Sequence, residues 1–420
     1  MDAEVRPLTA RLGPLVGTLA VWGPGLLVML ADTDAGNVVT AAQAGAQWGY
    51  RLLPLVLGLI PMLYLVQELA VRLGVHTGRG FGELINVCFG PKWAFLAALS
   101  LVVAVLGALV TQFTGVAGIG ELYGVSRGVT LPLASAALLL AVLTGSYRRV
   151  ELLALFVGLF ELAFFVVAWQ AHPDFATLAR QAVDLPIGDS GFLFLAAAII
   201  GSVFNPWMIF YQQSAVVGKD LRPEHIGAAR WDTALGAILT QFLTGAVLVA
   251  AAASFHAGGV KTSLDSIGEI GRAFAPFLGK ETGLLIFSMG VLGASLAAAI
   301  VASLALCWGL GEIIGGQRES GRRSPTRRLF DTKWFYGVFA GCIIGSAALV
   351  YVAQNLVWLN IAAQAMNALM FPLMIGLLIA LAARALREPF RLQGWRLQAM
   401  ITLAVLISTL GFVGALAGLA

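Results

Sequence analysis

The sequence predicts an all-α membrane protein, because three of its properties are typical of a chain that crosses a lipid bilayer many times. Hydrophobic residues make up 59% of the 420 residues and charged residues only 11%, against about 25% charged in an average soluble protein. The mean hydropathy is high, at +0.88. Apolar stretches of about 20 residues, the length of a membrane-spanning helix, recur along the whole chain.

We predict eleven transmembrane helices from these stretches. The first and the sixth are interrupted near their middle, and the other nine are continuous. The expected spans are 15–47, 52–71, 93–114, 129–146, 150–170, 191–217, 232–254, 282–310, 335–353, 356–383 and 397–419.

The basic residues predict that the N-terminal tail, residues 1–14, is cytoplasmic. In that orientation all but six of the 26 Lys and Arg residues fall on the cytoplasmic side, as the positive-inside rule requires. The six on the outer side are Arg51, Arg127, Arg180, Lys261, Arg272 and Lys280. We therefore expect a multi-pass, monomeric protein of the cytoplasmic (inner) membrane, surrounded by the lipid bilayer. The basic loop 318–333 is interpreted as a solvated loop, and no nucleic-acid partner is expected.

The first span contains two carboxylates and an amide near its middle: Asp32, Asp34 and Asn37. An ionisable side chain at membrane depth needs an ion, a counter-charge or water, and is a functional-site candidate for that reason. Gly36 and the polar residues around it also predict that the helix breaks over residues 32–37. Irregular backbone at this depth is tolerated where it lines a cavity or binds something.

A second interruption lies in the sixth span, at Asn205-Pro206. Proline cannot donate an intrahelical hydrogen bond and disfavours helical geometry at the residue before it, so an ordinary kink would also explain the pattern. The spacing favours another explanation. Five spans separate the interruptions, as expected if spans one to five and six to ten are inverted repeats. The predicted organisation is a first repeat at 15–170, a second at 191–383 and an eleventh helix at 397–420.

Oxygen-bearing side chains near the two interruptions form a candidate site for a divalent metal ion. Asp34 and Asn37 are three residues apart and can face one cavity, whereas Asp32 is expected to point elsewhere. A carboxylate, an amide and backbone carbonyls form a hard-ligand set suited to Mg²⁺, Ca²⁺ or Mn²⁺. Asn205 offers another oxygen, and unwound backbone at Ser202 would expose a carbonyl.

These residues also have structural explanations. Asp34 and Asn37 could cap the helix ends at the break, and Asn205 could satisfy backbone groups beside the proline. In the tenth span Gln364 and Asn367 lie on one face, where they could bind an ion or form hydrogen bonds between helices.

Two carboxylates stand apart from the interruptions, and neither indicates an enzyme. Glu68 has Arg72 one turn further along the helix, so an ion pair is the favoured interpretation. Glu161 is isolated in the fifth span and could relay protons.

The three cysteines are scattered, which argues against a disulfide framework or a zinc site, and no nucleotide-binding or hydrolase motif occurs. We therefore expect neither an enzyme nor a bound cofactor.

Several segments resemble the Nramp family of divalent-metal transporters. They are WGPGLLV at 22–28, DAGN at 34–37 (Asp-Pro-Gly-Asn in the family), QAGAQWGY at 43–50 and QELAVRLGVHTG at 67–78, with Gln364 placed eight residues before a proline. The resemblance runs from about residue 20 to 375. It implies a LeuT-like fold of eleven helices. It also implies that Asp34, Asn37, a Ser202 carbonyl and Gln364 bind the metal, with Asn205 at the position of a further ligand.

The chain departs from the family pattern at three places. Asn205-Pro206-Trp207 stands where the family has Met-Pro-His, which removes a soft thioether and a titratable histidine. Thr111 to Gly115 stands where the family has Thr-Asp-Leu-Ala-Glu, so two acids are missing. Thioethers favour transition metals, and their loss leaves a site of hard oxygens.

These departures resemble the Nramp-related magnesium transporters. The expected function is uncoupled, alternating-access uptake of Mg²⁺ and Mn²⁺, with the metal as substrate. The alternatives are a proton-coupled Mn²⁺ or Fe²⁺ importer, an amino-acid or amine carrier of the same fold, and a non-transporting membrane sensor or scaffold. An intramembrane aspartyl hydrolase would need buried aspartates on two helices, and the sequence suggests them only in the first span.

Overall fold

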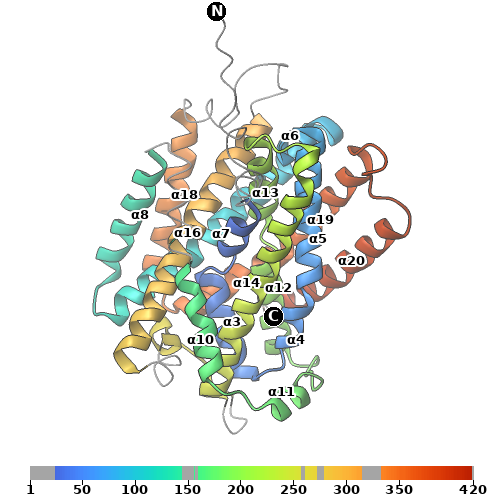
Figure 1. The fold of residues 1–420 in the computed structure, drawn as a ribbon. Coiled ribbons are helices and arrows are strands. Elements are labelled where there is room, and N and C mark those ends of the chain that lie inside the picture. The colour runs from blue at the N-terminus through green and yellow to red at the C-terminus, as the bar shows by residue number, and fades with distance from the viewer. Residues whose placement is uncertain are drawn as a thin grey trace, which may run out of the picture.

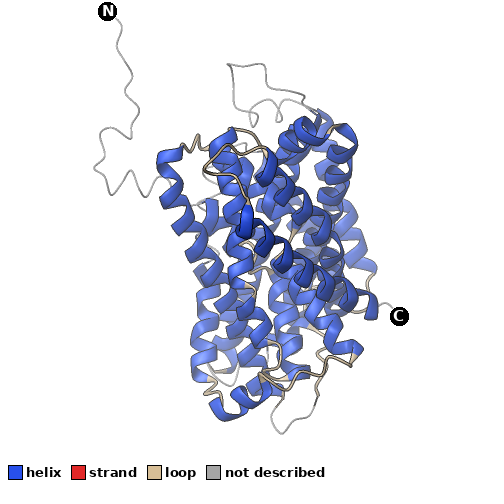
Figure 2. Ribbon diagram, turned by 90° about the vertical axis from the view of Figure 1, so that its right-hand side faces the viewer, coloured by secondary structure: helices blue, strands red, loops and turns tan. Residues whose placement is uncertain are grey.

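The computed structural model is an all-helical bundle, which confirms the predicted fold class. The structure describes residues 24–143, 156, 159–256, 261–271, 279–314 and 333–418. Within these ranges every regular element is a helix (Figure 2). The long helices run between two ends of the bundle. Helix α6 (Phe81–Phe89) lies at one end, and α4 (Leu53–Gly58) and α11 (Phe175–Gln181) lie at the other (Figure 1).

The helices that form the body of the bundle follow the predicted spans. In chain order they are α2 (Pro24–Leu30), α3 (Ala35–Trp48), α5 (Ile60–Thr77), α7 (Pro91–Leu122), α8 (Arg127–Leu143), the 3₁₀ turn η2 (Leu159–Leu162), α10 (Ala163–Gln170), α12 (Ser190–Val203), α13 (Pro206–Gly218), the 3₁₀ turn η3 (Pro223–His225), α14 (Ile226–Phe255), α16 (Lys280–Ile314), α18 (Lys333–Val352), α19 (Leu356–Arg384) and α20 (Gly394–Ala417).

Seven helical segments among the described residues are long and apolar enough to cross a membrane. They are Leu53–Thr77, Pro91–Leu122, Ser190–Gly218, Pro223–Phe255, Glu281–Ile314, Leu356–Arg384 and Gly394–Ala417. Shorter apolar helices cover Arg127–Leu140, Leu159–Gln170 and Tyr336–Val352. The count of eleven spans stays a prediction, as do the two inverted repeats. The tail at 1–14 and most of the loop at 318–333 lie outside the described residues.

Three predicted boundaries are corrected by the structure. The first break ends at Asp34, because α3 begins at Ala35, so Gly36 and Asn37 lie in its first turn. The second span continues to Thr77 and not 71, since Glu68 pairs with Arg72 and both remain in the helix. The third span reaches Leu122 and not 114.

The two broken helices lie at the centre of the bundle and are held there by their neighbours. Helix α14 packs along both α2 and α3, while α19 packs along α12. Helices α5 and α16 pack against α13, and α7 contacts α3, α16 and α19. The first break therefore lies among α7, α14 and α19, and the second beside α7 and α19. These three helices supply the polar side chains described next.

Candidate metal-binding site

The first break is closed by a carboxylate. Asp34 is the N-cap residue of α3, and its Oδ1 accepts a hydrogen bond from the backbone N–H of Asn37 at 2.8 Å. An N-cap carboxylate satisfies one of the free N–H groups at a helix start. The capping role that the sequence allowed for Asp34 is thus present. The side chain is buried, so the cap lies inside the protein.

The other oxygen of Asp34 is bound by Gln112 of α7. Gln112 donates from Nε2 to Asp34 Oδ2 at 2.5 Å and accepts from the backbone N–H of Ala35 at 3.3 Å. The Gln112 side chain therefore forms hydrogen bonds with both the Asp34 carboxylate and the first residue of α3. Gln112 is one of the residues that replace the acids of the family pattern, and the sequence did not indicate that it touches Asp34.

Helix α14 holds the first break from the opposite side through two threonines one turn apart. The hydroxyls of Thr33 and Thr240 lie 2.6 Å apart. Thr244 donates to Asn37 Oδ1 at 2.9 Å, and Asn37 Nδ2 donates to the backbone carbonyl of Asp32 at 3.3 Å. The sequence analysis missed both α14 threonines, although their i, i+4 spacing in an apolar helix was a usable signal.

The second break lies between α12 and α13. Asn205 precedes Pro206, the first residue of α13, and donates from Nδ2 to the Ser202 carbonyl at 3.2 Å. This is the backbone-satisfying role that the sequence allowed for Asn205. Its Oδ1 accepts from Asn367 Nδ2 of α19 at 2.5 Å, so Asn367 forms an interhelical hydrogen bond, one of the two roles that the sequence allowed.

Gln364 joins the two breaks. Its Oε1 accepts from Asn367 Nδ2 at 3.0 Å, and its Nε2 lies over Gly36. A Cβ atom at Gly36 would come 2.0 Å from Gln364 Nε2 and 2.9 Å from Asp34 Oδ1. Gly36 therefore permits Gln364 to lie beside the Asp34 carboxylate. It does not break the helix.

The predicted site residues form two hydrogen-bonded groups. At the first break Asn37 bonds to Asp34 and, through its side chain, to α14. At the second break Asn205 bonds to the Ser202 carbonyl, and Asn367 joins Asn205 to Gln364, whose Nε2 lies over Gly36 beside the first break. The atoms available to bind a metal are carboxylate, amide and carbonyl oxygens, a set that suits hard divalent ions. Within the described ranges no three His, Cys, Asp or Glu residues come close enough together to hold a metal ion.

Asp32 is buried beside the first of these groups. Neither of its carboxylate oxygens has a hydrogen-bond partner among the described residues, and its backbone carbonyl accepts from Asn37 Nδ2 at 3.3 Å. The expectation that Asp32 points elsewhere than Asp34 stays a prediction.

The buried Asp232 of α14 corrects a further expectation, since buried aspartates are not confined to the first span. Its carboxylate accepts from the backbone N–H of Gly25 at 2.8 Å and of Leu26 at 3.3 Å. Asp232 therefore binds the start of α2, as a helix-capping carboxylate does. An aspartyl hydrolase would need the two carboxylates to face each other, and these hydrogen bonds assign Asp232 a structural role.

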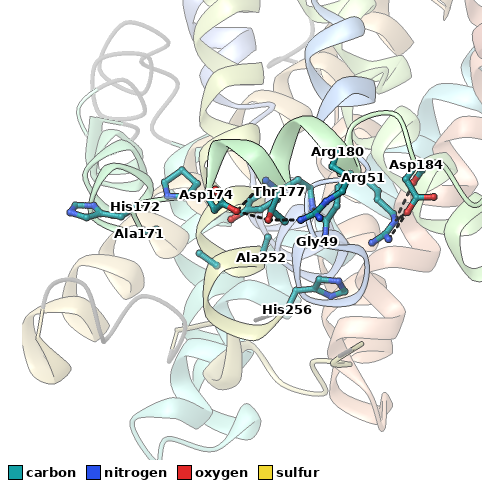
Figure 3. Close-up of a pocket in the computed structure, with 14 residues that line it drawn as sticks. Gly49, Arg51, Ala171, His172, Asp174, Thr177, Arg180, Asp184, Ala252 and His256 are labelled. Atoms are coloured by element: carbon teal, nitrogen blue, oxygen red, sulfur yellow. Dashed lines mark hydrogen bonds and ion pairs between the residues drawn. The ribbon is translucent and has the colours of Figure 1, made fainter. Parts of the chain in front are cut away.

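A cavity of about 590 Å³ opens at the α11 end of the bundle. Figure 3 shows that α11 and the ends of α3 and α14 surround it. Arg51 and Asp184 form an ion pair at 2.7 Å, and Gln181 accepts from the Tyr50 N–H at 2.9 Å. The hydroxyl and amide of Thr177 and the amide of Ala176 lower the pKa of the Asp174 carboxyl. The contacts of Arg51 and Tyr50 hold α11 against the end of α3, and Asp174 caps the start of α11.

A family comparison identifies the chain. The family described as "Natural resistance-associated macrophage protein-like", or Nramp, matches residues 25–416. The chain belongs to the Nramp family. It is a multi-pass membrane transporter of divalent metal cations, and the metal is its substrate. The resemblance found in the sequence is confirmed at this level.

Curated relatives of this Nramp protein carry the same description. The chain is 30% identical to the divalent metal cation transporter MntH of Yersinia pestis over 300 residues, which are 68% of this chain and 71% of that protein. It is 28% identical to MntH of Bradyrhizobium diazoefficiens over 302 residues, 68% of this chain and 66% of that protein.

Solved structures confirm a LeuT-like fold. A manganese transporter of Eremococcus coleocola superposes with a TM-score of 0.75 at 18% identity, over 98% of this chain and 88% of that one. MhsT in complex with L-phenylalanine superposes with a TM-score of 0.61 at 15% identity, over 94% of this chain and 98% of that one.

The departures of this Nramp chain from the family pattern have structural consequences. A Cβ atom at Gly115 would lie 2.6 Å from the Ala35 Cβ and 2.7 Å from the Ser295 hydroxyl, so α7 packs here where a glutamate would not fit. Trp207 is fully buried, and its indole N–H has no partner among the described residues. Gln112, Gly115 and Trp207 are therefore neutral residues at the positions where the family pattern has acids and a histidine.

Proposed function

We propose that this Nramp protein carries Mg²⁺, and also Mn²⁺, into the cytoplasm by alternating access without moving a proton. It would act as a monomer in the cytoplasmic membrane, with its N-terminus in the cytoplasm. Asp34, Asn37, the Ser202 carbonyl, Asn205 and Gln364 would bind the ion. These assignments make the protein a member of the Nramp-related magnesium transporter branch.

The proposal rests on the neutral Gln112 amide, which is hydrogen-bonded to the Asp34 carboxylate. Gln112 lies on α7, the helix where the family pattern has acids, and its Nε2 donates to the Asp34 carboxylate at 2.5 Å. A side-chain amide does not take up or release protons in the physiological range. Asn205, in the place of a soft methionine, presents a hard oxygen, and this oxygen and that of Gln364 both accept hydrogen bonds from Asn367 Nδ2. Hard oxygens suit Mg²⁺, which keeps several of its water molecules when bound.

A proton-coupled manganese importer is the second candidate. The descriptions of the relatives favour it, since they name divalent metal cation and manganese transporters. The two candidates differ in what accompanies the metal. An importer coupled to protons acidifies the compartment that it fills, and an uncoupled carrier does not.

Uptake into proteoliposomes that contain a magnesium dye and a pH dye separates the candidates. We expect Mg²⁺ to enter without acidification, and Mn²⁺ to compete with it. Empty liposomes with the same metal gradient serve as the control. Entry of Mn²⁺ alone, accompanied by protons, would contradict the proposal.

A further inference from the structure

A groove between α19 and α20 lies apart from the proposed metal site. It has a volume of about 540 Å³ and is lined by α19 from Pro372 to Arg384 and by α20 from Leu397 to Thr409. Figure 1 shows the loop that joins the two helices at the edge of the bundle. Ile401 and Val405, which line the groove from α20, are 44% and 57% exposed. The groove is therefore open on a face of the protein that the bilayer covers.

The length of the groove matches one leaflet of a bilayer. Its lining extends over twelve residue steps in each helix, from 372 to 384 and from 397 to 409. At 1.5 Å per residue this is about 18 Å along either helix, and half of a hydrocarbon core of about 30 Å is about 15 Å. An acyl chain that enters at the membrane surface would therefore run along the whole groove.

The lining has the polarity of an amphiphile. Of the residues that form it, Arg384 alone is charged, and it lies at the end where the two helices are joined. The polar Ser408 and Thr409 lie at the opposite end, and the residues between the two ends are apolar. Trp395, at the start of α20, is 73% exposed. Tryptophan is enriched where a membrane meets water, so the Arg384 end is expected at that level.

Arginines without an acidic partner gather at this end of the groove. The segment from 384 to 396 contains Arg384, Arg387, Arg391 and Arg396, but only one acid, Glu388. All four arginines are exposed, and none belongs to an ion pair found between described residues. The mouth of the groove therefore carries positive charge that no described carboxylate neutralises.

The loop that carries these arginines is held against the bundle. The Leu392 N–H donates to the Ala382 carbonyl at 3.2 Å, and the Phe390 carbonyl accepts from Arg72 of α5 at 3.4 Å. The Phe390 ring also stacks on His76, with the ring centroids 3.9 Å apart. These contacts tie the loop to the ends of α5 and α19, so the positive charge has a fixed place beside the groove.

We propose that the groove between α19 and α20 binds an anionic phospholipid of the bilayer, with an acyl chain along the groove and the phosphate at Arg384 and the neighbouring arginines. Arginine binds phosphate through two parallel hydrogen bonds, and basic pockets between transmembrane helices suit anionic headgroups. Two copies of the chain that met here in one membrane would bring their arginines to the same level, where like charges repel. The inference is independent of the metal that the protein carries.

Native mass spectrometry of the purified protein in detergent tests the inference. Phosphatidylglycerol and phosphatidylcholine with the same acyl chains are titrated in parallel. We expect one phosphatidylglycerol to bind about fivefold more tightly than phosphatidylcholine, or better. Salt should reduce this preference, because it screens exposed charges.

The variant Arg384→Gln tests the headgroup site. We expect it to weaken phosphatidylglycerol binding about fivefold, equivalent to ~1 kcal/mol for one arginine, and to leave phosphatidylcholine binding unchanged. Arg222→Gln, at a 67% exposed arginine between α13 and α14, is the matched control and should change neither.

The variant Ala380→Phe tests the acyl-chain site, because its ring would fill the groove that Ala380 lines. We expect it to weaken the binding of both lipids. Ala399→Phe, at an exposed position of α20 that does not line the groove, is the control. Thermal unfolding without added lipid shows whether each variant is folded, and Arg384→Gln, at an exposed position, decides the test where Ala380→Phe does not fold.

Three results would overturn the inference. Equal binding of the two lipids by the wild type would mean that the groove holds bulk lipid without selecting a headgroup. A preference for phosphatidylglycerol that Arg384→Gln retains in full would place the bound lipid elsewhere on the protein. A dimer that Ala380→Phe dissociates would make the groove an interface between two copies of the chain. None of these measurements involves metal uptake, so their failure is distinct from a failure of the proposed function.

Discussion

Asp34 has a structural role and a proposed binding role, and the two can be distinguished. The carboxylate caps α3 through the Asn37 N–H and is held by Gln112. Asparagine is as good an N-cap as aspartate, whereas alanine loses the cap. A substitution that keeps the cap and removes the charge therefore isolates the binding role.

We expect Asp34→Asn and Asp34→Ala both to abolish metal uptake, because neither supplies a carboxylate. Only Asp34→Ala should lower the free energy of unfolding markedly, by about 1 kcal/mol, the usual effect of losing a cap. Dye-based uptake and thermal unfolding in detergent measure the two effects. Substantial Mg²⁺ uptake by Asp34→Asn would show that the charge of Asp34 is not needed for binding.

Asn205 should determine which ion the site prefers. Methionine at this position would place a soft sulfur in the proposed site and favour transition metals and Cd²⁺ over Mg²⁺. We expect Asn205→Met to raise the ratio of Cd²⁺ to Mg²⁺ uptake about tenfold, equivalent to ~1.4 kcal/mol. Asn86→Met, in α6 at the end of the bundle, is the control. An unchanged ion profile in Asn205→Met would mean that Asn205 is not a ligand.

At the scale of elements, the site depends on how closely α19 approaches α12. A Cβ atom at Gly201 would lie 1.8 Å from the Gln364 carbonyl oxygen and 2.8 Å from the Ala368 backbone nitrogen. Both are backbone atoms and cannot rotate away. The glycine therefore determines the distance between the two helices, and with it the position of Gln364.

We expect Gly201→Ala to lower the free energy of unfolding by about 1–3 kcal/mol, as overpacking does, and to reduce uptake. Gly376→Ala in the same helix pair is the control, because no atom lies within 4 Å of its added Cβ. That change should stabilise α19 slightly, by about 0.5–1 kcal/mol. Equal stability of the two variants would contradict the close packing.

The elements differ in how well the sequence predicted them, and the reason is the range of the interactions. Both breaks were predicted because their causes are local: a proline after Asn205, and a polar run in an apolar span. The predicted ends of α5 and α7 were wrong because the hydropathy of the sequence falls before each helix ends. Gln112 was missed as a partner of Asp34, since a contact across 78 residues leaves no local pattern. The same holds for the capping of α2 by Asp232.

At the scale of the whole molecule, the two breaks form one polar cluster inside a bundle that is closed around it. Asp34, Asn205 and Gln364 are all buried. Contacts at α11 fasten one end of α3, and Asp232 binds the start of α2 at the other end of the broken helix. In the proposed alternating-access cycle the cluster meets one side of the membrane at a time, and we expect these two sets of contacts to open in turn.

An uncoupled carrier of this kind should be driven by the membrane potential alone. For a divalent ion, an inside-negative potential of about 100 mV supplies about 4.6 kcal/mol, which corresponds to a roughly 2,000-fold accumulation at equilibrium. We expect a potassium gradient with valinomycin to drive Mg²⁺ into proteoliposomes. A pH gradient at zero potential should drive none, because no proton moves with the metal. Accumulation under the pH gradient alone would contradict the uncoupled mechanism and favour proton-coupled import.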